Sequence, residues 1–325
     1  MRKPEIVKRN IDLSLFTSFK IGGPAQYFAK VSKLEEIFEV LLWAKEKNLS
    51  YYILGGGTNI LIPDNGIDGL VIKNSYNFKK RENSSVLVGS GCQLAEVLRF
   101  AYLNNLSGLE WAAGIPGTVG GAIRSNAGAY GKSISQVLGR ITFLDFNPPC
   151  FEVKHIFPQD CQFGYRKSLF QEKPWIIWQA QLKLKRVEKK NEIFQRIEKY
   201  RKKRKNQPKA PSAGCIFKNI EIKDIGQRSL EKIEKEFPEV RQFYKKGIIP
   251  AGWLIEKMDL KGRTIGRAQI SPEHANFIIN LGGATADNVL TLISIIKQKA
   301  RNEFNIQLQE EINILNWGQT PQRGG

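Results

Sequence analysis

The sequence predicts an α+β protein with more than one domain. Its 325 residues exceed the usual size of one compact domain, for which about 150 residues is typical. Helical and strand-like segments follow one another without an internal repeat, and glycine-rich turns separate them. Hydrophobic residues make up 42% of the chain and charged residues 25%, which is ordinary globular usage, so we expect most of the chain to fold.

The first predicted unit is a helix, a strand and a glycine turn. Residues 32–48 begin with a capping serine and carry apolar side chains on one helical face. These side chains are Leu34, Ile37, Phe38, Leu41 and Leu42. Residues 51–54 then read as a short strand, which three consecutive glycines bring to an end.

Further strands and a helix are predicted in the middle of the chain. Short strands fall within 70–88, and a helix follows around 94–103. After a glycine-rich stretch at 114–131, strands resume at 141–146 and 175–184. The last of these alternates apolar and polar residues toward its end, as a half-buried strand should.

The stretch 186–209 is densely basic and is predicted to form an amphipathic helix with a basic outer face. Its apolar residues at helical spacing are Ile193, Phe194, Ile197 and Tyr200. Gln207-Pro208 would end the helix. A nucleic-acid-binding arm is the alternative interpretation, but no aromatic stacking residues are interleaved with the charges.

The last part of the chain is predicted to hold two helical segments and a strand. Residues 224–246 form a highly charged helical piece, and residues 287–304 form a clear helix. The expected buried stripe of that helix is Val289, Leu290, Leu292, Ile293 and Ile296. Residues 306–315 have the pattern of a strand, and we expect the polar residues 320–325 to be disordered.

Composition limits the class of ligand and the compartment. Lysine and arginine outnumber aspartate and glutamate by 50 to 31, and a net charge of +19 attracts phosphates and carboxylates, although a solvated basic surface explains it equally well. Four cysteines without a CxxC pair argue against a disulfide framework and a zinc site, so we expect no metal and a reducing compartment. Without an apolar signal or about 20 consecutive apolar residues, we expect a cytoplasmic protein without membrane insertion.

The glycine loop at residues 54–59 (LGGGTN) indicates a phosphate-binding function. It follows a strand, where glycines let backbone N–H groups converge on an anion. It is not a Rossmann fingerprint, because no third glycine follows and the next residues contain a proline. Gly131-Lys132-Ser133 is not a P-loop, because Asn126 stands where that motif needs a glycine. For one glycine triplet alone, a tight turn is the simpler interpretation.

A second glycine-rich region favours the phosphate-binding interpretation over a simple turn. Residues 113–122 and 125–131 are denser in glycine than a structural turn requires. A strand-and-helix module separates this region from the first loop. The two loops together therefore predict a long, bent ligand with a diphosphate, such as a dinucleotide that lies in a cleft.

Seven motifs occur in a fixed order along nearly the whole chain. They are TSFKIGGPA (17–25), LGGGTNILI (54–62), GLEWAAGIPGTVGGAI (108–123), NAGAYG (126–131), FGYRKSLF (163–170), PSAGCIFKN (211–219) and SPEHANFIIN (271–280). Together they resemble the UDP-N-acetylenolpyruvoylglucosamine reductases, the MurB family. The resemblance implies a vanillyl-alcohol-oxidase (PCMH) type FAD-binding domain in two subdomains, 1–69 and 70–207. An α+β substrate-binding domain, 208–304, and a C-terminal strand and tail that return to the active site, 305–325, would follow.

The resemblance also implies the reaction. NADPH would reduce the bound FAD, and the flavin N5 would pass a hydride to the enolpyruvyl group of UDP-N-acetylglucosamine enolpyruvate. The product would be UDP-N-acetylmuramate, for peptidoglycan synthesis. The implied cofactor-binding residues lie in the glycine loops: Gly55, Gly56, Gly57, Thr58, Asn59, Gly114, Ile115, Pro116, Gly117, Thr118, Gly120, Gly121, Ala122, Asn126 and Gly128.

Three positions match the catalytic residues of the family. Arg166, in FGYR, would stabilise the enolate that hydride transfer creates, since a guanidinium fork suits a carboxylate. Cys215 stands where the family has serine and would protonate the enolate, because a thiol is mostly protonated at neutral pH. Glu311 would assist the arginine, although strand parity turns it outward and leaves Glu310 as a rival.

For the diphosphate and uridine of the substrate, the resemblance implies Lys205, Asn219, His274 and Asn276. The short stretch from Arg166 to Cys215 is similar to the family branch that lacks a tyrosine-bearing lid loop, and the charged insertion 221–249 departs from the family pattern. We expect a monomer that binds no nucleic acid. Two alternatives remain: another flavin oxidoreductase of this type with a different substrate, and a basic RNA-binding protein whose glycine stretches are only turns.

Overall fold

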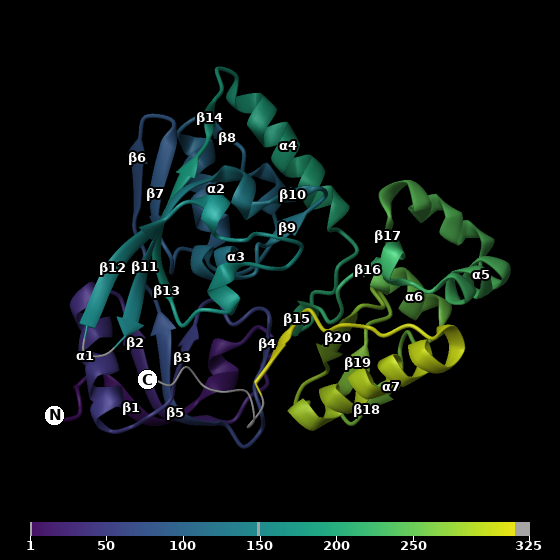
Figure 1. Cartoon of the computed structure of the whole chain (residues 1–325), viewed down its shortest axis with the longest axis horizontal. Helices are drawn as coiled ribbons and strands as arrows, with labels where there is room; N and C mark the ends of the chain where they lie inside the picture. Colours follow the sequence, from purple (N-terminus) through teal and green to yellow (C-terminus); the bar gives the residue numbers. More distant parts are fainter. Residues whose placement is uncertain (1, 148–149, 316–325) are drawn as a thin grey trace.

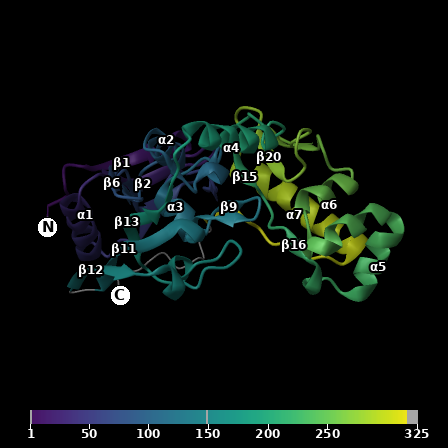
Figure 2. The same cartoon turned by 90° about the horizontal axis from the view of Figure 1, so that it is seen from above.

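The computed structural model describes residues 2–147 and 150–315, and this part of the chain forms three lobes (Figure 1). The first two lobes lie one above the other, and the third lies beside them. Seen from above, the third lobe occupies one end of the molecule (Figure 2). Strands and helices are mixed along the whole described chain, as the α+β prediction requires.

The first lobe is built on a four-stranded sheet with the order β1-β2-β5-β3. Its strands span, in that order, Val7–Asp12, Pro24–Val31, Ile67–Asn74 and Tyr51–Leu54. β1 runs antiparallel to β2, whereas β5 pairs in parallel with both β2 and β3. The predicted strand at 51–54 is confirmed as β3, and the first glycine loop begins at its carboxyl end.

Helix α1, Leu34–Glu46, packs against this sheet. The Glu36 carboxylate accepts hydrogen bonds from the backbone N–H groups of Ser32 and Lys33, at 2.6 and 3.1 Å, and so starts the helix. The buried residues of α1 are Ile37, Val40, Leu41, Trp43 and Ala44. The prediction of a buried Leu42 was wrong, because the buried stripe continues through Val40 and Ala44 and leaves Leu42 39% exposed.

The predicted boundary after residue 69 needs correction, because it falls inside β5. Residues 67–74 form the strand that joins β2 to β3, so a division there would split the sheet. Leu70 and Ile72 are fully buried in the core that the sheet shares with α1. The first lobe therefore extends to Asn74.

The second lobe holds a five-stranded antiparallel sheet with the order β12-β11-β13-β7-β6. Its strands span, in that order, Cys150–Ile156, Leu138–Asn147, Ile176–Lys183, Ser85–Gly89 and Lys79–Glu82. Helices α2, Leu94–Leu103, and α3, Val119–Arg124, contribute to its core. The predicted helix at 94–103 and the strands at 141–146 and 175–184 are confirmed. Strand β6 was not predicted, because its residues (KKRE) show no apolar alternation.

Helix α4, Lys190–Lys203, flanks the second lobe and ends before the predicted stop at Gln207-Pro208. Ile193 and Ile197 are buried, as predicted. Phe194 was wrongly assigned to the buried face: its side chain is 46% exposed, because the face that packs against the lobe carries Ile193, Ile197 and Tyr200.

The third lobe holds a four-stranded sheet with the order β15-β20-β19-β18. Its strands span Ser212–Cys215, Phe277–Asn280, Ala268–Ile270 and Thr264–Ile265, and its helices are α5 (Gln227–Glu236), α6 (Ala251–Lys257) and α7 (Ala286–Phe304). The predicted helix at 287–304 is confirmed as α7, which Thr285 caps by accepting a hydrogen bond from the Asn288 N–H at 3.1 Å. The charged piece 224–246 divides into α5 and the 3-10 helix η7, Pro238–Lys246.

Short elements complete the described chain. The short strands are β4 (Ile60–Leu61), β8 (Leu106–Ser107), β9 (Gly128–Ala129), β10 (Lys132–Ser133), β14 (Lys185–Arg186), β16 (Ile220–Glu221), β17 (Ile248–Ile249) and β21 (Asn313–Ile314). The other 3-10 helices are η1 (Leu13–Phe16), η2 (Glu110–Ala112), η3 (Ile134–Val137), η4 (Pro158–Asp160), η5 (Leu169–Gln171) and η6 (Ile222–Asp224).

The predicted strand at 306–315 is mostly wrong. Only β21 pairs with another strand, β4, and Glu310 forms a single bridge with Phe217. The apolar alternation has a different cause, since Ile306, Leu308 and Ile312 pack into the core of the third lobe. The tail 320–325, expected to be disordered, lies outside the described residues.

Buried contacts join the first lobe to the third. Asn280, only 5% exposed, donates to the Phe19 carbonyl at 3.0 Å and accepts from the N–H groups of Gly282 and Ala284 at 2.8 and 3.0 Å. The Ser18 hydroxyl donates to the Ser212 carbonyl at 2.7 Å. Phe19 also belongs to the apolar core of the third lobe. This junction fixes the position of β15 relative to the first glycine loop.

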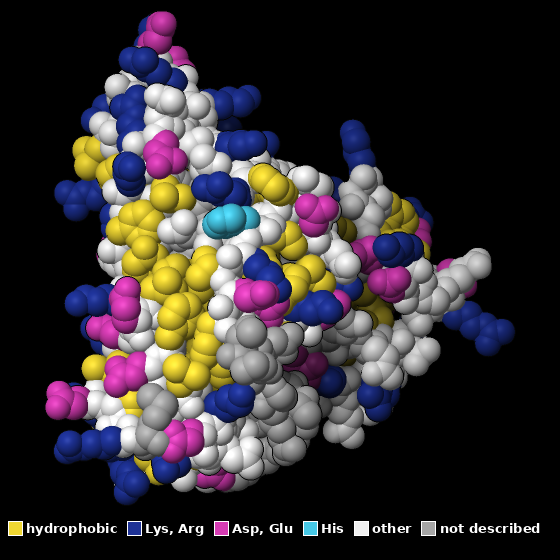
Figure 3. Space-filling model, turned by 60° about the vertical axis from the view of Figure 1, so that its left-hand side comes forward, with side chains coloured by type: hydrophobic (Ala, Val, Ile, Leu, Met, Phe, Trp, Pro, Cys, Tyr) yellow, Lys and Arg dark blue, Asp and Glu magenta, His cyan; other side chains and the backbone are white. Residues whose placement is uncertain are grey.

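Charged side chains are scattered over the face in Figure 3, where Lys and Arg (dark blue) and Asp and Glu (magenta) surround a hydrophobic area (yellow). Nothing on this face gathers the basic residues into one stripe. Within residues 2–147 and 150–315, no helix is long and apolar enough to cross a membrane, and no three His, Cys, Asp or Glu side chains gather as a metal site would require.

We predict that Asn280→Ala destabilises the protein. The change removes buried hydrogen bonds and leaves the Phe19 carbonyl unsatisfied, which costs about 2–4 kcal/mol. The thermal unfolding midpoint should fall by roughly 4–8 °C. Asn191→Ala, at an exposed position on α4, is the control and should leave the midpoint unchanged. Equal midpoints for the two variants would contradict this role of Asn280.

Candidate active site

A cavity of about 1670 Å³ lies where the three lobes meet. Both glycine loops line it, together with the turn that carries Arg166, the segment after α4, and β15. The residues predicted to bind the cofactor all line this cavity, and so do Arg166, Cys215 and Glu311. The fold therefore brings together residues that the sequence analysis selected from motifs far apart in the chain.

The first glycine loop connects β3 to β4 and approaches its surroundings very closely. Gly57 has a φ of +65°, and a Cβ there would lie 2.0 Å from the Phe16 carbonyl oxygen. A Cβ on Gly56 would lie 2.8 Å from the Cα of Gly117 in the second loop. Only glycine fits at these two positions, because any side chain would collide with the backbone.

This loop also offers free hydrogen-bond donors. The backbone N–H groups of Gly56, Gly57 and Thr58 donate to no acceptor among the residues that the structure describes. Such consecutive amides form an anion-binding concavity. Across from them, Thr118 caps α3 by accepting from the Gly121 N–H at 3.4 Å. These features fit the diphosphate of the FAD that the sequence motifs imply.

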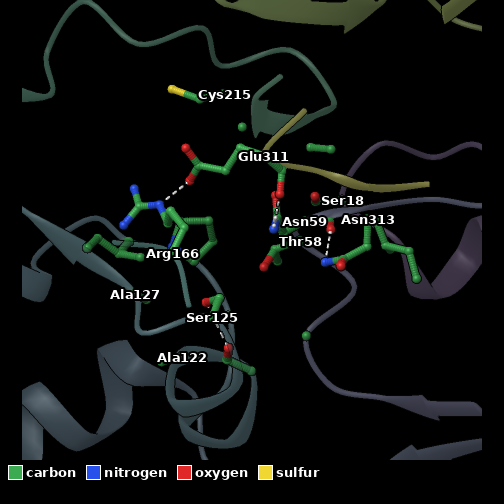
Figure 4. Close-up of a pocket in the computed structure, with 18 of the residues that line it drawn as sticks. Ser18, Thr58, Asn59, Ala122, Ser125, Ala127, Arg166, Cys215, Glu311 and Asn313 are labelled. Carbon is green, nitrogen blue, oxygen red and sulfur yellow. Dashed lines mark hydrogen bonds and ion pairs between the residues drawn. The ribbon is translucent and has the colours of Figure 1, made fainter. Parts of the chain in front are cut away.

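Arg166 and Glu311 meet on one side of the cavity (Figure 4). The Nε of Arg166 donates to a carboxylate oxygen of Glu311, and its Nη1 donates to the Gly128 carbonyl at 3.0 Å. Its Nη2 donates to none of the described residues. The guanidinium is therefore held in place while one edge stays available for an anion, such as a carboxylate of a bound molecule.

A tight turn places the Arg166 side chain next to Glu311. The N–H groups of Gly164 and Lys167 each donate to the carbonyl of the other, at 3.0 and 3.2 Å, and Arg166 has a left-handed φ of +54°. The Asn126 amide donates to the Gly164 carbonyl at 2.8 Å. Although we predicted Asn126 as a cofactor-binding residue, this hydrogen bond supports the turn that presents the arginine.

The structure distinguishes Glu311 from Glu310. Glu311 is held between lobes, because its N–H donates to the Ile216 carbonyl at 2.7 Å and its carbonyl accepts from Asn59 at 3.1 Å. Glu310 points instead to α7 and pairs with Lys297 at 2.7 Å. Burial raises the pKa of the Glu311 carboxyl, and the nearby Arg166 charge opposes that increase. The carboxylate that reaches the arginine is therefore Glu311.

Cys215 ends β15 on the same side of the cavity as Arg166 and Glu311 (Figure 4). Burial raises the pKa of its thiol to about 12, and the negative charge of Glu311 adds to the increase. The positive charges of Arg166 and Arg204 act in the opposite direction. The thiol is therefore fully protonated at neutral pH and can donate a proton.

The predicted substrate-binding residues fall into three groups. Asn219 and His274 line the cavity, and burial lowers the pKa of His274, so its ring is neutral at pH 7. Asn276 also lines it, but both ends of its amide bond to the Phe217 backbone at 2.9 Å, so it supports the segment after β15. Lys205 is exposed and lies outside the lining, so its role in substrate binding stays a prediction.

Arg204, the residue before Lys205, does line the cavity. Its guanidinium lies 5.7 Å from the ring centre of Tyr130, and its Nε finds no partner among the described residues. Arg204 was not predicted, because a run of basic residues does not reveal which one turns inward. Tyr165 was missed as well; its hydroxyl accepts from the Asn219 N–H at 3.2 Å.

Comparison with known proteins supports the family that the motifs indicate. Residues 25–145 match the FAD binding domain family, and residues 207–315 match the UDP-N-acetylenolpyruvoylglucosamine reductase C-terminal domain family. The chain is 35% identical over 314 residues to the UDP-N-acetylenolpyruvoylglucosamine reductase of Synechococcus sp. (strain JA-3-3Ab), which covers 95% of this chain and 91% of the relative. The protein of the same name from Clostridium tetani is 36% identical over 318 residues, or 96% of this chain and 92% of the relative.

A solved structure extends the similarity to the fold. The crystal structure of UDP-N-acetylenolpyruvylglucosamine reductase (MurB) from Thermus caldophilus superposes with a TM-score of 0.75 at 32% identity, covering 95% of this chain and 99% of that one. The predicted α+β fold with an FAD-binding part and a C-terminal domain is thus confirmed. The chain belongs to the UDP-N-acetylenolpyruvoylglucosamine reductase (MurB) family and is an FAD-dependent oxidoreductase.

Proposed function

We propose that this chain uses NADPH to reduce the enolpyruvyl group of UDP-N-acetylglucosamine enolpyruvate to UDP-N-acetylmuramate, for peptidoglycan synthesis. The observation that carries the proposal is the arrangement of Arg166, Glu311 and a protonated Cys215 in a cavity that both glycine loops also line. The names of the curated relatives support the same substrate.

Arg166 and Glu311 would stabilise the negative charge of the reaction. FAD held by the two glycine loops would supply the hydride chemistry between NADPH and the methylene carbon of the enolpyruvyl group. The neighbouring carbon and its carboxylate then carry the charge of an enolate. The free Nη2 edge of Arg166 would bind that carboxylate, because Glu311 and Gly128 already fix the rest of the guanidinium.

Cys215 would complete the reaction by protonating the enolate carbon. The S–H bond breaks as a C–H bond forms, and the enolate electron pair becomes that bond. The resulting thiolate would regain a proton from solvent, because its pKa of about 12 lies far above neutral pH. Asn219, His274 and Arg204 line the part of the cavity that we assign to the sugar nucleotide.

An NADPH oxidation assay tests the function. Purified protein that carries FAD should be yellow, and it should oxidise NADPH rapidly only when the enolpyruvyl sugar nucleotide is present. Equal rates with and without this substrate would count against the proposal. A colourless protein that binds no flavin on reconstitution would remove every flavoenzyme interpretation.

We predict that Arg166→Met lowers kcat by roughly a hundred- to a thousand-fold, because the developing enolate loses its cationic partner. The visible spectrum of the flavin should be retained. Arg99→Met, at an exposed position on α2, serves as the control and should keep full activity. Steady-state kinetics measure both variants, and full activity of Arg166→Met would rule out its role.

We predict different effects for two changes at Cys215. Cys215→Ser should retain activity, since a hydroxyl can still donate a proton, whereas Cys215→Ala should slow oxidation of the reduced flavin by the substrate. Reduction of the flavin by NADPH should be unaffected in both. Rapid-mixing absorbance measurements separate the two half-reactions. Equal, full activity of the two variants would exclude Cys215 as the donor.

The raised pKa of Cys215 also predicts a pH dependence. The proton donor must be protonated, so activity is lost only as the pH rises toward about 12. The substrate-dependent half-reaction should therefore keep its rate between about pH 7 and 9, whereas an ordinary thiol with a pKa near 8.5 would lose it there. A pH profile of this single turnover is the measurement. A decline with an apparent pKa near 8.5 would contradict the burial of the thiol.

A further inference from the structure

Lys73 lies behind the first glycine loop. It belongs to β5, where it pairs in register with Leu54 at the end of β3. Its Nζ donates a hydrogen bond to the carbonyl oxygen of Gly55. Gly55, Gly56 and Gly57 line the cavity, whereas Lys73 lies outside the lining. The ammonium thus contacts the loop from the side away from the cavity.

This contact orients a peptide group. In a planar trans peptide the C=O and N–H bonds point in opposite directions. Because the Gly55 carbonyl points to Lys73, the N–H of Gly56 in the same peptide unit points away from Lys73. That N–H is one of the donors without an acceptor among the described residues. Lys73 therefore fixes the direction of a donor in the loop that fits a diphosphate.

The charge of Lys73 has no protein counterion within residues 2–147 and 150–315, where no carboxylate comes within ion-pair distance of it. The neighbouring charge is also positive: Lys30 on β2 lies opposite Lys73 in the register with β5. Burial lowers the pKa of the Lys73 ammonium, and Lys30 lowers it further. A desolvated ammonium without a partner is costly, so an anion close to the loop would stabilise the folded protein.

We propose that Lys73 is a positioning residue for FAD, which holds the Gly56 N–H toward the cavity and attracts the cofactor's diphosphate across the loop. None of the motifs selected Lys73, since it precedes no glycine and lies in an ordinary strand sequence, GLVIKN. The proposal depends on FAD binding and not on the identity of the reduced substrate, so it can fail while the proposed reaction stands.

Two matched variants test the proposal on the full chain. Lys73→Met keeps the length of the side chain and removes its charge and donor. Lys30→Met removes the adjacent, exposed charge, which within residues 2–147 and 150–315 makes no hydrogen bond to the loop. The affinity of the flavin-free protein for FAD is measured by quenching of flavin fluorescence. The thermal unfolding midpoint of each variant is measured with and without saturating FAD.

Lys73→Met should weaken FAD binding at least tenfold, and Lys30→Met should change it less than about threefold. A residue that only supported the fold would lower the midpoint of the flavin-free protein. We expect instead that Lys73→Met leaves this midpoint unchanged or raises it, and that FAD raises it by less than in the unaltered chain. FAD affinity within twofold of the unaltered chain would overturn the proposal. A lower midpoint or failure to fold without flavin would also overturn it, by assigning Lys73 to stability.

Discussion

Arg166 and Glu311 lie 145 residues apart in the chain, and their contact on one side of the cavity sets the geometry on which the proposed chemistry depends. The arginine comes from a tight turn in the second lobe, and the glutamate comes from the C-terminal segment. Asn59, in the first glycine loop, binds the Glu311 carbonyl. The ion pair and this hydrogen bond together connect the first glycine loop, the turn and the C-terminal segment. A displacement of any of the three would therefore move the guanidinium.

Desolvation decides the protonation states around this pair. It keeps the Cys215 thiol protonated, as a proton donor requires. Desolvation also raises the pKa of the Glu311 carboxyl, and the charge of Arg166 opposes that increase. Lys73 shows the same constraint outside the cavity, where its ammonium donates to the Gly55 carbonyl behind a loop with free N–H groups and no carboxylate compensates it among the described residues. The described protein thus has unpaired donors and positive charge where an anionic cofactor and substrate would bind.

Much of this fold could be predicted from sequence periodicity and motif order. The strands at 51–54 and 175–184 and the helix at 94–103 were recognised because their local patterns agree with their tertiary environments. The segment 306–315 was not, because alternation reports which side chains are buried and cannot report whether a neighbouring strand exists. The boundary at residue 69 failed for a similar reason, since the partners of β5 are distant in sequence.

The candidate site was predictable where a motif fixes a residue and unpredictable where only the fold does. Arg166 and Cys215 lie in motifs, and both line the cavity. Strand parity left Glu310 as a rival to Glu311, and only the three-dimensional structure separates them. Arg204 and Lys73 depend on where α4 ends and on which strands pair, and neither is visible in local sequence.

The central claim is that an exchangeable proton from the protein completes the reduction. The most direct measurement is the NMR spectrum of the product formed by the enzyme in D₂O. The account predicts deuterium on the carbon next to the carboxylate, because the Cys215 thiol exchanges with solvent before it donates. Hydrogen retained at that carbon in D₂O would contradict the account.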